Sequence, residues 1–235
     1  MSSMAKCPAR NPQPLTFTSA SRIQNSLAAT AEKRTLIWLA NHTPSWINSD
    51  HLTILGFVSH CAAGLCYALA RRHPDVLLVG IVCLALNWLG DSLDGTLARV
   101  RNRQRPRYGF YLDHISDTIA AFFLMAGLAL SGYLHPAIAL GMLIAFLMLS
   151  IEAYLATYTL GQFQLSYWKF GPTEIRILLA YGNVALLRHP RIKLFHHAVP
   201  IFDLGGVIAM AGMGLMLMVS TLRHTIRLYA EERIA

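Results

Sequence analysis

Four aspartates lie at helical spacing within an apolar stretch of the sequence. Asp91 and Asp94 are three residues apart, and Asp113 and Asp117 are four residues apart. Residues three or four apart share one face of an α-helix, so each pair presents its carboxylates on the same side. A carboxylate in an apolar environment is costly unless a cation, a water-filled cavity or protonation compensates for it. The spacing therefore indicates a chemical site rather than a solvated surface.

The two pairs of carboxylates suit a hard divalent cation. About sixteen residues connect their segments, and antiparallel neighbouring helices joined in this way bring both pairs to the same depth. Oxygen ligands without a His or Cys partner favour Mg²⁺ or Mn²⁺ over zinc. We expect two cations, because four carboxylates on one ion leave excess negative charge and paired metals stabilise both ends of a phosphoryl displacement.

Small residues and a cation surround the aspartates. Gly95, Ala98 and Gly109 leave room for a ligand, and Arg99 adds a guanidinium that can grip a phosphate in two places. Metal ligands, an arginine for a phosphate and small residues that leave space together predict a site for a molecule that contains a pyrophosphate. Because this site falls where an apolar segment meets the lipid headgroups, one substrate is predicted to be a lipid.

The chain that carries these residues has the composition of a membrane protein. Its 235 residues are 54% hydrophobic and 14% charged, with a mean hydropathy of +0.43. Soluble proteins average about 25% charged residues, so an ordinary soluble domain, a coiled coil and a disordered chain are excluded. A segment of about 20 apolar residues spans a bilayer. The predicted spans are residues 52–70, 76–93, 110–133, 137–160, 174–187 and 201–222, of which the fifth is marginal in length.

One all-α integral membrane domain is predicted, preceded by a polar segment. Residues 1–25 contain no apolar signal segment and are expected to form a disordered cytoplasmic tail. Residues 26–50 are expected to form an amphipathic interfacial helix and a linker, although a short surface helix packed on the membrane domain fits the same pattern. Residues 51–235 form the predicted six-helix domain.

The basic residues predict the orientation in the membrane. Lys and Arg number 20 against 12 Asp and Glu, which gives a net charge of +8. They gather at segment ends, where anionic headgroups are closer partners than nucleic acid. Fifteen of them fall on the side of the amino terminus, which the positive-inside rule makes cytoplasmic. We expect a multi-pass protein of a cytoplasmic membrane, such as a bacterial inner membrane, with its site facing the cytoplasm and no nucleic-acid partner.

A family signature covers the four aspartates. The stretch reads Asp91-Ser-Leu-Asp94-Gly95-Thr-Leu-Ala98-Arg99 and, nine residues later, Gly109-Phe-Tyr-Leu-Asp113-His-Ile-Ser-Asp117. It resembles the signature of the CDP-alcohol phosphatidyltransferase family at all eight defining positions. The resemblance implies six helices around a polar cavity open to the cytoplasmic side, often in a homodimer. It also implies a reaction in which a CDP-linked group passes to an alcohol with release of CMP.

The resemblance also implies roles for individual residues. Asp91, Asp94 and Asp113 would hold the metals, and Asp117 would complete the second metal site and act as the base. The implied CDP contacts are Thr53, Asp94, Gly95, Ala98, Arg99 and Gly109. Asp50 stands where the family pattern predicts an Asn.

Four residues are candidates for binding the acceptor: Arg107, Lys169, Glu174 and Arg176. Arg176 can bind a phosphate on the acceptor or pair with Glu152, and both interpretations remain open. Glu174 fits equally well as a capping residue at a helix start. Arg107 shares a basic loop with other arginines, for which headgroup contact is the more usual role.

Two further polar residues in the spans are expected to be structural. Asp203 is more typical of a structural partner than of a catalyst, and His60 is expected to be a packing residue.

The predicted protein is a metal-dependent transferase of phospholipid synthesis. The favoured reaction moves a phosphatidyl group from CDP-diacylglycerol to a polar alcohol or alcohol phosphate. One alternative is a CDP-choline or CDP-ethanolamine donor with a diacylglycerol acceptor, since both donors share the cytidine and pyrophosphate chemistry. An alternative of another class is a divalent-cation or proton-coupled transporter, because such proteins also use intramembrane carboxylates.

Overall fold

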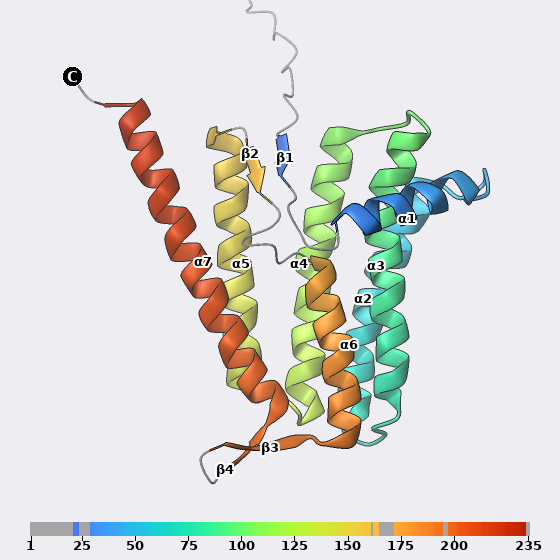
Figure 1. Ribbon diagram of the computed structural model, residues 1–235, viewed down its shortest axis with the longest axis vertical. Helices are drawn as coiled ribbons and strands as arrows, with labels where there is room; N and C mark the ends of the chain where they lie inside the picture. Colours follow the sequence, from blue (N-terminus) through green and yellow to red (C-terminus); the bar gives the residue numbers. More distant parts are fainter. Residues whose placement is uncertain (1–20, 24–28, 161, 165–171, 195–196, 234–235) are drawn as a thin grey trace, which may run out of the picture.

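The computed structural model describes residues 21–23, 29–160, 162–164, 172–194 and 197–233 (Figure 1). Residues 1–20 of the predicted tail and the candidate Lys169 lie outside this part of the chain. The helices are α1 (Ala29–His42), α2 (Ser49–Ala70), α3 (Val76–Val100), α4 (Pro106–Ser131), α5 (Pro136–Leu160), α6 (Pro172–Arg188) and α7 (Ile201–Glu231). The strands are β1 (Ser21–Ile23), β2 (Gln162–Gln164), β3 (Arg191–Leu194) and β4 (His197–Pro200).

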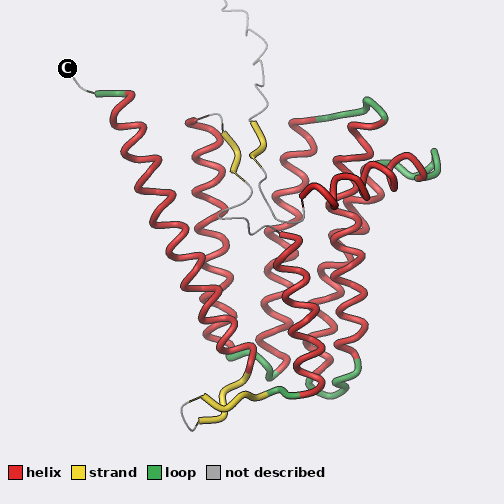
Figure 2. Tube along the Cα trace, viewed as in Figure 1, coloured by secondary structure: helices red, strands yellow, loops and turns green. Residues whose placement is uncertain are grey.

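The helices form two groups. α2, α3, α4 and α6 pack side by side, and α5 pairs with α7 next to α4 (Figure 1). α1 packs on α3 and crosses the upper end of the bundle at a steep angle. The strands, drawn yellow in Figure 2, form two small sheets: β1 pairs with β2 in parallel, and β3 pairs with β4 in an antiparallel hairpin. These strands were not predicted, but they leave the protein in the all-α class.

Every predicted span coincides with a helix. Five helices, α2, α3, α4, α5 and α7, are long and apolar enough to cross a membrane. α6 occupies the position of the predicted fifth span, but with 17 residues it is shorter than these five. The prediction of an all-α, multi-pass membrane protein is therefore confirmed for five spanning helices, and the sixth span stays a prediction.

Two helices continue well beyond the predicted spans. α3 runs to Val100 rather than to Leu93, and α7 runs to Glu231 rather than to Leu222. Hydropathy marks where a helix leaves the hydrocarbon, whereas Leu, Ala and Arg are good helix formers that carry it further. The connection from α3 to α4 therefore shortens to residues 101–105, and the aspartates of α3 lie within the helix instead of at its end.

α2 lies against both helices that carry the aspartates, and glycines allow close contact on each side. A methyl group on Gly90 of α3 would stand 2.5 Å from the backbone nitrogen of Gly56 on α2. A methyl group on Gly127 of α4 would overlap the carbonyl oxygen of Gly64 on α2. Small residues let helix backbones approach in a membrane, where burial from water does not drive association. α2 therefore sets the spacing between α3 and α4.

Polar contacts fix the remaining helices. The buried Tyr67 hydroxyl of α2 donates to Asn183 Oδ1 of α6 at 2.8 Å. At the start of α5, Asp203 Oδ1 of α7 accepts from the backbone nitrogen of His135 at 2.6 Å. Asp203 thus makes the structural contact that was expected of it.

α1 combines features of both predicted settings. Leu36 and Ala40 are buried in a cluster with residues of α2 and α3, so one face of the helix packs on the membrane domain. Trp38 on the same helix is 60% exposed, and Trp46 in the following turn is 72% exposed. Exposed tryptophans suit the headgroup region. One face of α1 packs on the membrane domain, and its location in the membrane interface stays a prediction.

Replacing Gly127 with alanine is expected to lower the melting temperature. Overpacking of a tight contact costs about 1–3 kcal/mol, and here the obstacle is the backbone of Gly64. The matched control is Gly212→Ala on α7, where an added methyl group meets nothing within 4 Å. Thermal unfolding in detergent measures both variants. Equal melting temperatures for the two variants would contradict close packing of α2 on α4.

Candidate active site

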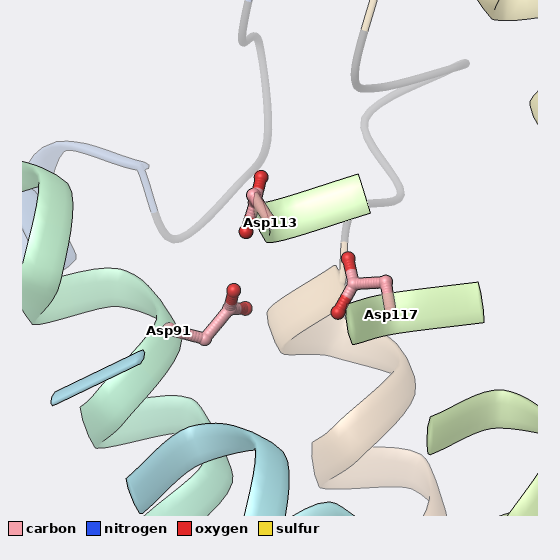
Figure 3. A group of neighbouring side chains, drawn as sticks. All are labelled: Asp91, Asp113 and Asp117. Atoms are coloured by element: carbon pink, nitrogen blue, oxygen red, sulfur yellow. The ribbon is translucent and has the colours of Figure 1, made fainter. Parts of the chain in front are cut away.

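Three carboxylates converge between α3 and α4. Asp91 projects from α3 toward Asp113 and Asp117 of α4 (Figure 3). One oxygen from each lies within 4.8 Å of the others. The helical spacing of the sequence explains the pair on α4, and the antiparallel course of α3 and α4 explains why the third carboxylate meets it. The convergence expected from the sequence is therefore present for these three residues.

α2 lines the space between the carboxylates. A pocket at this place is lined by the aspartates together with Thr53, Gly56, Phe57 and His60 of α2. His60 was expected to be a packing residue, but the structure places it in the wall of this pocket. Its spacing of seven residues from Thr53 puts both on one face of α2, a signal that the sequence contained.

Asp94 lines the same pocket but is directed differently from the other three aspartates. Its Oδ2 accepts from the Thr53 hydroxyl at 2.6 Å, and its Oδ1 accepts from the backbone nitrogen of Gly95. The Ser49 hydroxyl donates to the backbone oxygen of Asp94 at 2.8 Å. Asp94 thus joins α3 to the start of α2, and the group at metal-binding distances contains three carboxylates instead of the expected four.

Arg176 of α6 reaches the carboxylate cluster. Its Nη2 donates to Asp91 Oδ2 at 2.5 Å, and its Nε donates to Asn87 Oδ1 at 2.7 Å. The buried Asn87 in turn donates to the carbonyl oxygen of Gly56 at 3.0 Å. A cation beside a carboxylate lowers the cost of burying negative charge, so Arg176 offsets part of the repulsion within the cluster.

In the structure Arg176 pairs with Asp91, whereas Glu152 has a partner on α7. Glu152 of α5 lies 2.6 Å from His224 Nδ1 of α7, and this contact holds the α5–α7 pair. Glu174 lies in the first turn of α6, the position for which helix capping was considered.

The small residues leave space beside the aspartates as predicted. A methyl group on Gly109 would meet nothing within 4 Å, and one on Gly95 would meet only Arg99 Nη1, at 3.5 Å. Arg99 is exposed, and its Nη2 donates to Thr96 Oγ1 at 3.0 Å. Ala98 lies one turn after the aspartate pair on the same helix. The end of α3 is thus open enough to admit a ligand beside a guanidinium.

The basic loop divides into structural and exposed arginines. Arg101 donates to the carbonyl oxygens of Ile47, Thr43 and Pro44, at 2.5, 2.8 and 3.0 Å, and so fixes the turn between α1 and α2. Arg105 forms an ion pair with Asp50, the residue that departs from the family pattern. Arg107 is exposed in the first turn of α4. Arg105 and Arg107 are both exposed and can meet a headgroup or an incoming phosphate, whereas Arg101 is part of the turn.

Sequence reasoning missed Glu32 of α1. Its Oε1 accepts from Trp88 Nε1 at 2.9 Å, from the Ser92 hydroxyl at 3.3 Å and from the Thr173 hydroxyl at 3.0 Å. Ser92 directly follows Asp91, so Glu32 contacts the turn of α3 that carries this aspartate. No local pattern marks a contact between residues so far apart in the chain, and in its helix Glu32 reads as an ordinary polar residue beside Lys33.

Comparison with known proteins identifies the class. The sequence profile of the CDP-alcohol phosphatidyltransferase family matches residues 46–222, which includes every element of the pocket. The chain belongs to this family, as the signature indicated.

A relative of known name matches part of the chain. Archaetidylinositol phosphate synthase of Methanothermobacter thermautotrophicus is 32% identical over 85 residues, which are 36% of this chain and 40% of the relative. The match thus spans less than half the length of either protein.

Replacing Asp91 with asparagine is expected to weaken Mn²⁺ binding. Asparagine keeps the size of the side chain but removes the charge that attracts the cation. Loss of even an outer-shell partner of a metal typically costs 10–100-fold in affinity, so the dissociation constant should rise at least about tenfold. The dissociation constant is measured for protein in detergent by electron paramagnetic resonance of the free Mn²⁺. Asp75→Asn, the same change at the far end of α3, is the control; equal affinities in the two variants would rule out Asp91 as a ligand.

Proposed function

We propose that this protein transfers a phosphatidyl group from CDP-diacylglycerol to a polar alcohol or alcohol phosphate and releases CMP. The observation that carries the proposal is the convergence of Asp91, Asp113 and Asp117 on one pocket in a chain of this family. The five helices that are long and apolar enough to cross a membrane support a lipid as one substrate.

The donor set fits Mg²⁺ or Mn²⁺. It consists of carboxylate oxygens alone, within 4.8 Å of one another, and neither His nor Cys belongs to it. We assign Asp91, Asp94, Asp113 and Asp117 as the residues that would hold two such ions; Asp94 here accepts a hydrogen bond from Thr53. Bound there, the ions would neutralise the pyrophosphate and make CMP a better leaving group.

The chain's own residues bind, orient and deprotonate the substrates. Arg99 binds the pyrophosphate, and Gly95, Ala98 and Gly109 leave room for the cytidine, with Thr53 as a further contact. Asp117 accepts the proton of the attacking hydroxyl. The hydroxyl oxygen forms a bond to the phosphorus of the phosphatidyl group as the bond from that phosphorus to the CMP oxygen breaks. Direct displacement needs no covalent enzyme intermediate.

A phosphorylated alcohol is the favoured acceptor. Arg176 places a guanidinium beside the carboxylate cluster, where it suits a phosphate on the acceptor. The relative is named as a synthase of archaetidylinositol phosphate, and this name supports a phosphorylated product here. Arg107, Lys169 and Glu174 complete the proposed acceptor site.

The proposed setting is a homodimer in a cytoplasmic membrane with the site on the cytoplasmic side. In this setting α6, at the position of the predicted fifth span, also crosses the membrane, and α1 lies in the interface. The excess of Lys and Arg on the side of the amino terminus supports this orientation. The exposed Trp38 and Trp46 support the interfacial position of α1.

Purified protein with Mg²⁺ or Mn²⁺ is expected to release CMP from CDP-diacylglycerol only when a polar alcohol or its phosphate is added. Asp117→Asn should lower the rate at least about a hundredfold, because a general base typically contributes 10²–10⁴-fold. Asp203→Asn, the same change in the cap of α5, should keep most of the activity. Chromatographic assay of CMP measures all three proteins.

Two outcomes would contradict the proposal. Release from CDP-choline or CDP-ethanolamine with diacylglycerol, but not from CDP-diacylglycerol, would assign the alternative donor. Divalent-cation flux into proteoliposomes, with no CMP release and no thermal stabilisation by CMP, would assign transport.

A further inference from the structure

Glu32 connects three elements at the level of the carboxylate cluster. From α1, its Oε1 accepts from Trp88 and Ser92 of α3 and from Thr173 of α6. Trp88 and Ser92 are four residues apart and flank Asp91 in the sequence, so Glu32 holds the turn of α3 that carries this aspartate. One oxygen atom thereby joins α1 and α6 to the wall of the site.

Stability alone gives no reason for a carboxylate at this position. The other oxygen of Glu32, Oε2, is buried and has no hydrogen-bond partner within the described part of the chain. A buried carboxylate oxygen without a partner is costly, and an apolar side chain of similar size avoids that cost. An apolar residue would pack here at lower cost, but it would lose the hydrogen bonds to Trp88, Ser92 and Thr173.

Thr173 and Arg176 lie three residues apart in the first turns of α6 and share a face of the helix. Thr173 is held by Glu32, and Arg176 reaches Asp91 and Asn87. Lower on the same helix, Asn183 is held by Tyr67. The position of the first turn, and with it the guanidinium, thus depends on the contact between Glu32 and Thr173.

We propose that Glu32 is a positioning residue that holds the start of α6, through Thr173, so that Arg176 stays against Asp91. This inference rests on the proposed function only in taking Asp91 as a metal ligand. Glu32 does not touch the substrates. It couples the helix before the first span to the charge balance of the site.

The test is Mn²⁺ binding to purified full-length protein in detergent, measured by electron paramagnetic resonance of the free ion. Arg176 competes with a cation for an oxygen of Asp91, so releasing it tightens Mn²⁺ binding. Thr173→Val removes the hydroxyl and keeps the shape, and should tighten binding about threefold, the effect of losing one hydrogen bond. Thr173→Ser keeps the hydroxyl and should bind Mn²⁺ with the affinity of the wild type.

Two double-mutant cycles separate positioning from a general structural effect. In the background of Arg176→Gln, Thr173→Val should have no further effect on Mn²⁺ affinity, because the guanidinium is already gone. In the background of Glu32→Ala, Thr173→Val should also leave Mn²⁺ affinity unchanged, because the carboxylate that accepts the hydrogen bond of Thr173 is gone. Asp203→Asn, which loosens the cap of α5, should lower the melting temperature and leave Mn²⁺ affinity unchanged.

The possible results distinguish this inference from the proposed function. If Thr173→Val changed Mn²⁺ affinity equally in the wild-type and Arg176→Gln backgrounds, the positioning role would be overturned. Unchanged or weaker Mn²⁺ binding by Thr173→Val in the wild-type background would overturn it as well. If the wild-type protein binds no Mn²⁺, the metal site itself is wrong and the inference falls with it. Should Glu32→Ala fail to fold, the Thr173 and Arg176 cycle still decides the question.

Discussion

Repulsion among carboxylates in an apolar protein is the constraint on which this structure depends. Asp91, Asp113 and Asp117 bring their oxygens within 4.8 Å of one another in helices that are otherwise apolar enough to span a membrane. Like charges at this separation disfavour each other strongly where the dielectric constant is low. Within the described part of the chain, the guanidinium of Arg176 donates to Asp91 and offsets part of this repulsion. A cluster of three acids under these conditions supports the proposed cation site.

The cluster exists only because three helices approach closely. Gly56 against Gly90 and Gly64 against Gly127 let α2 lie on α3 and α4, and the pocket opens along this shared neighbour. Larger residues at these positions would separate the helices and move Asp91 away from the carboxylates of α4. The glycines of the bundle and the acids of the site therefore depend on each other, because close backbones bring the carboxylates of α3 and α4 to one pocket.

The sequence predicts what depends on position along one helix and fails where contacts come from another. Spacing placed Asp113 and Asp117 on one face, and the family signature marked them together with Asp91. Hydropathy found the helices, but it ended α3 too early, because helix propensity continues past the hydrocarbon boundary. Two contacts depend on how the helices are rotated against each other: the hydrogen bond of Asp94 with Thr53 and that of Arg176 with Asp91. The periodicity of the sequence does not specify this rotation.

The contacts of Glu32 likewise depend on packing between helices, which the sequence does not specify. α1 has the composition of a surface helix, and its buried leucine and exposed tryptophan explain its packing without any reference to chemistry. Its one carboxylate nevertheless binds donors on α3 and α6. In the positioning role proposed for Glu32, α1 is thereby tied to the charge balance of the pocket, since a shift of α1 changes the hydrogen bond to Thr173 at the start of α6. A single side chain thus connects α1 to the two helices that carry Asp91 and Arg176.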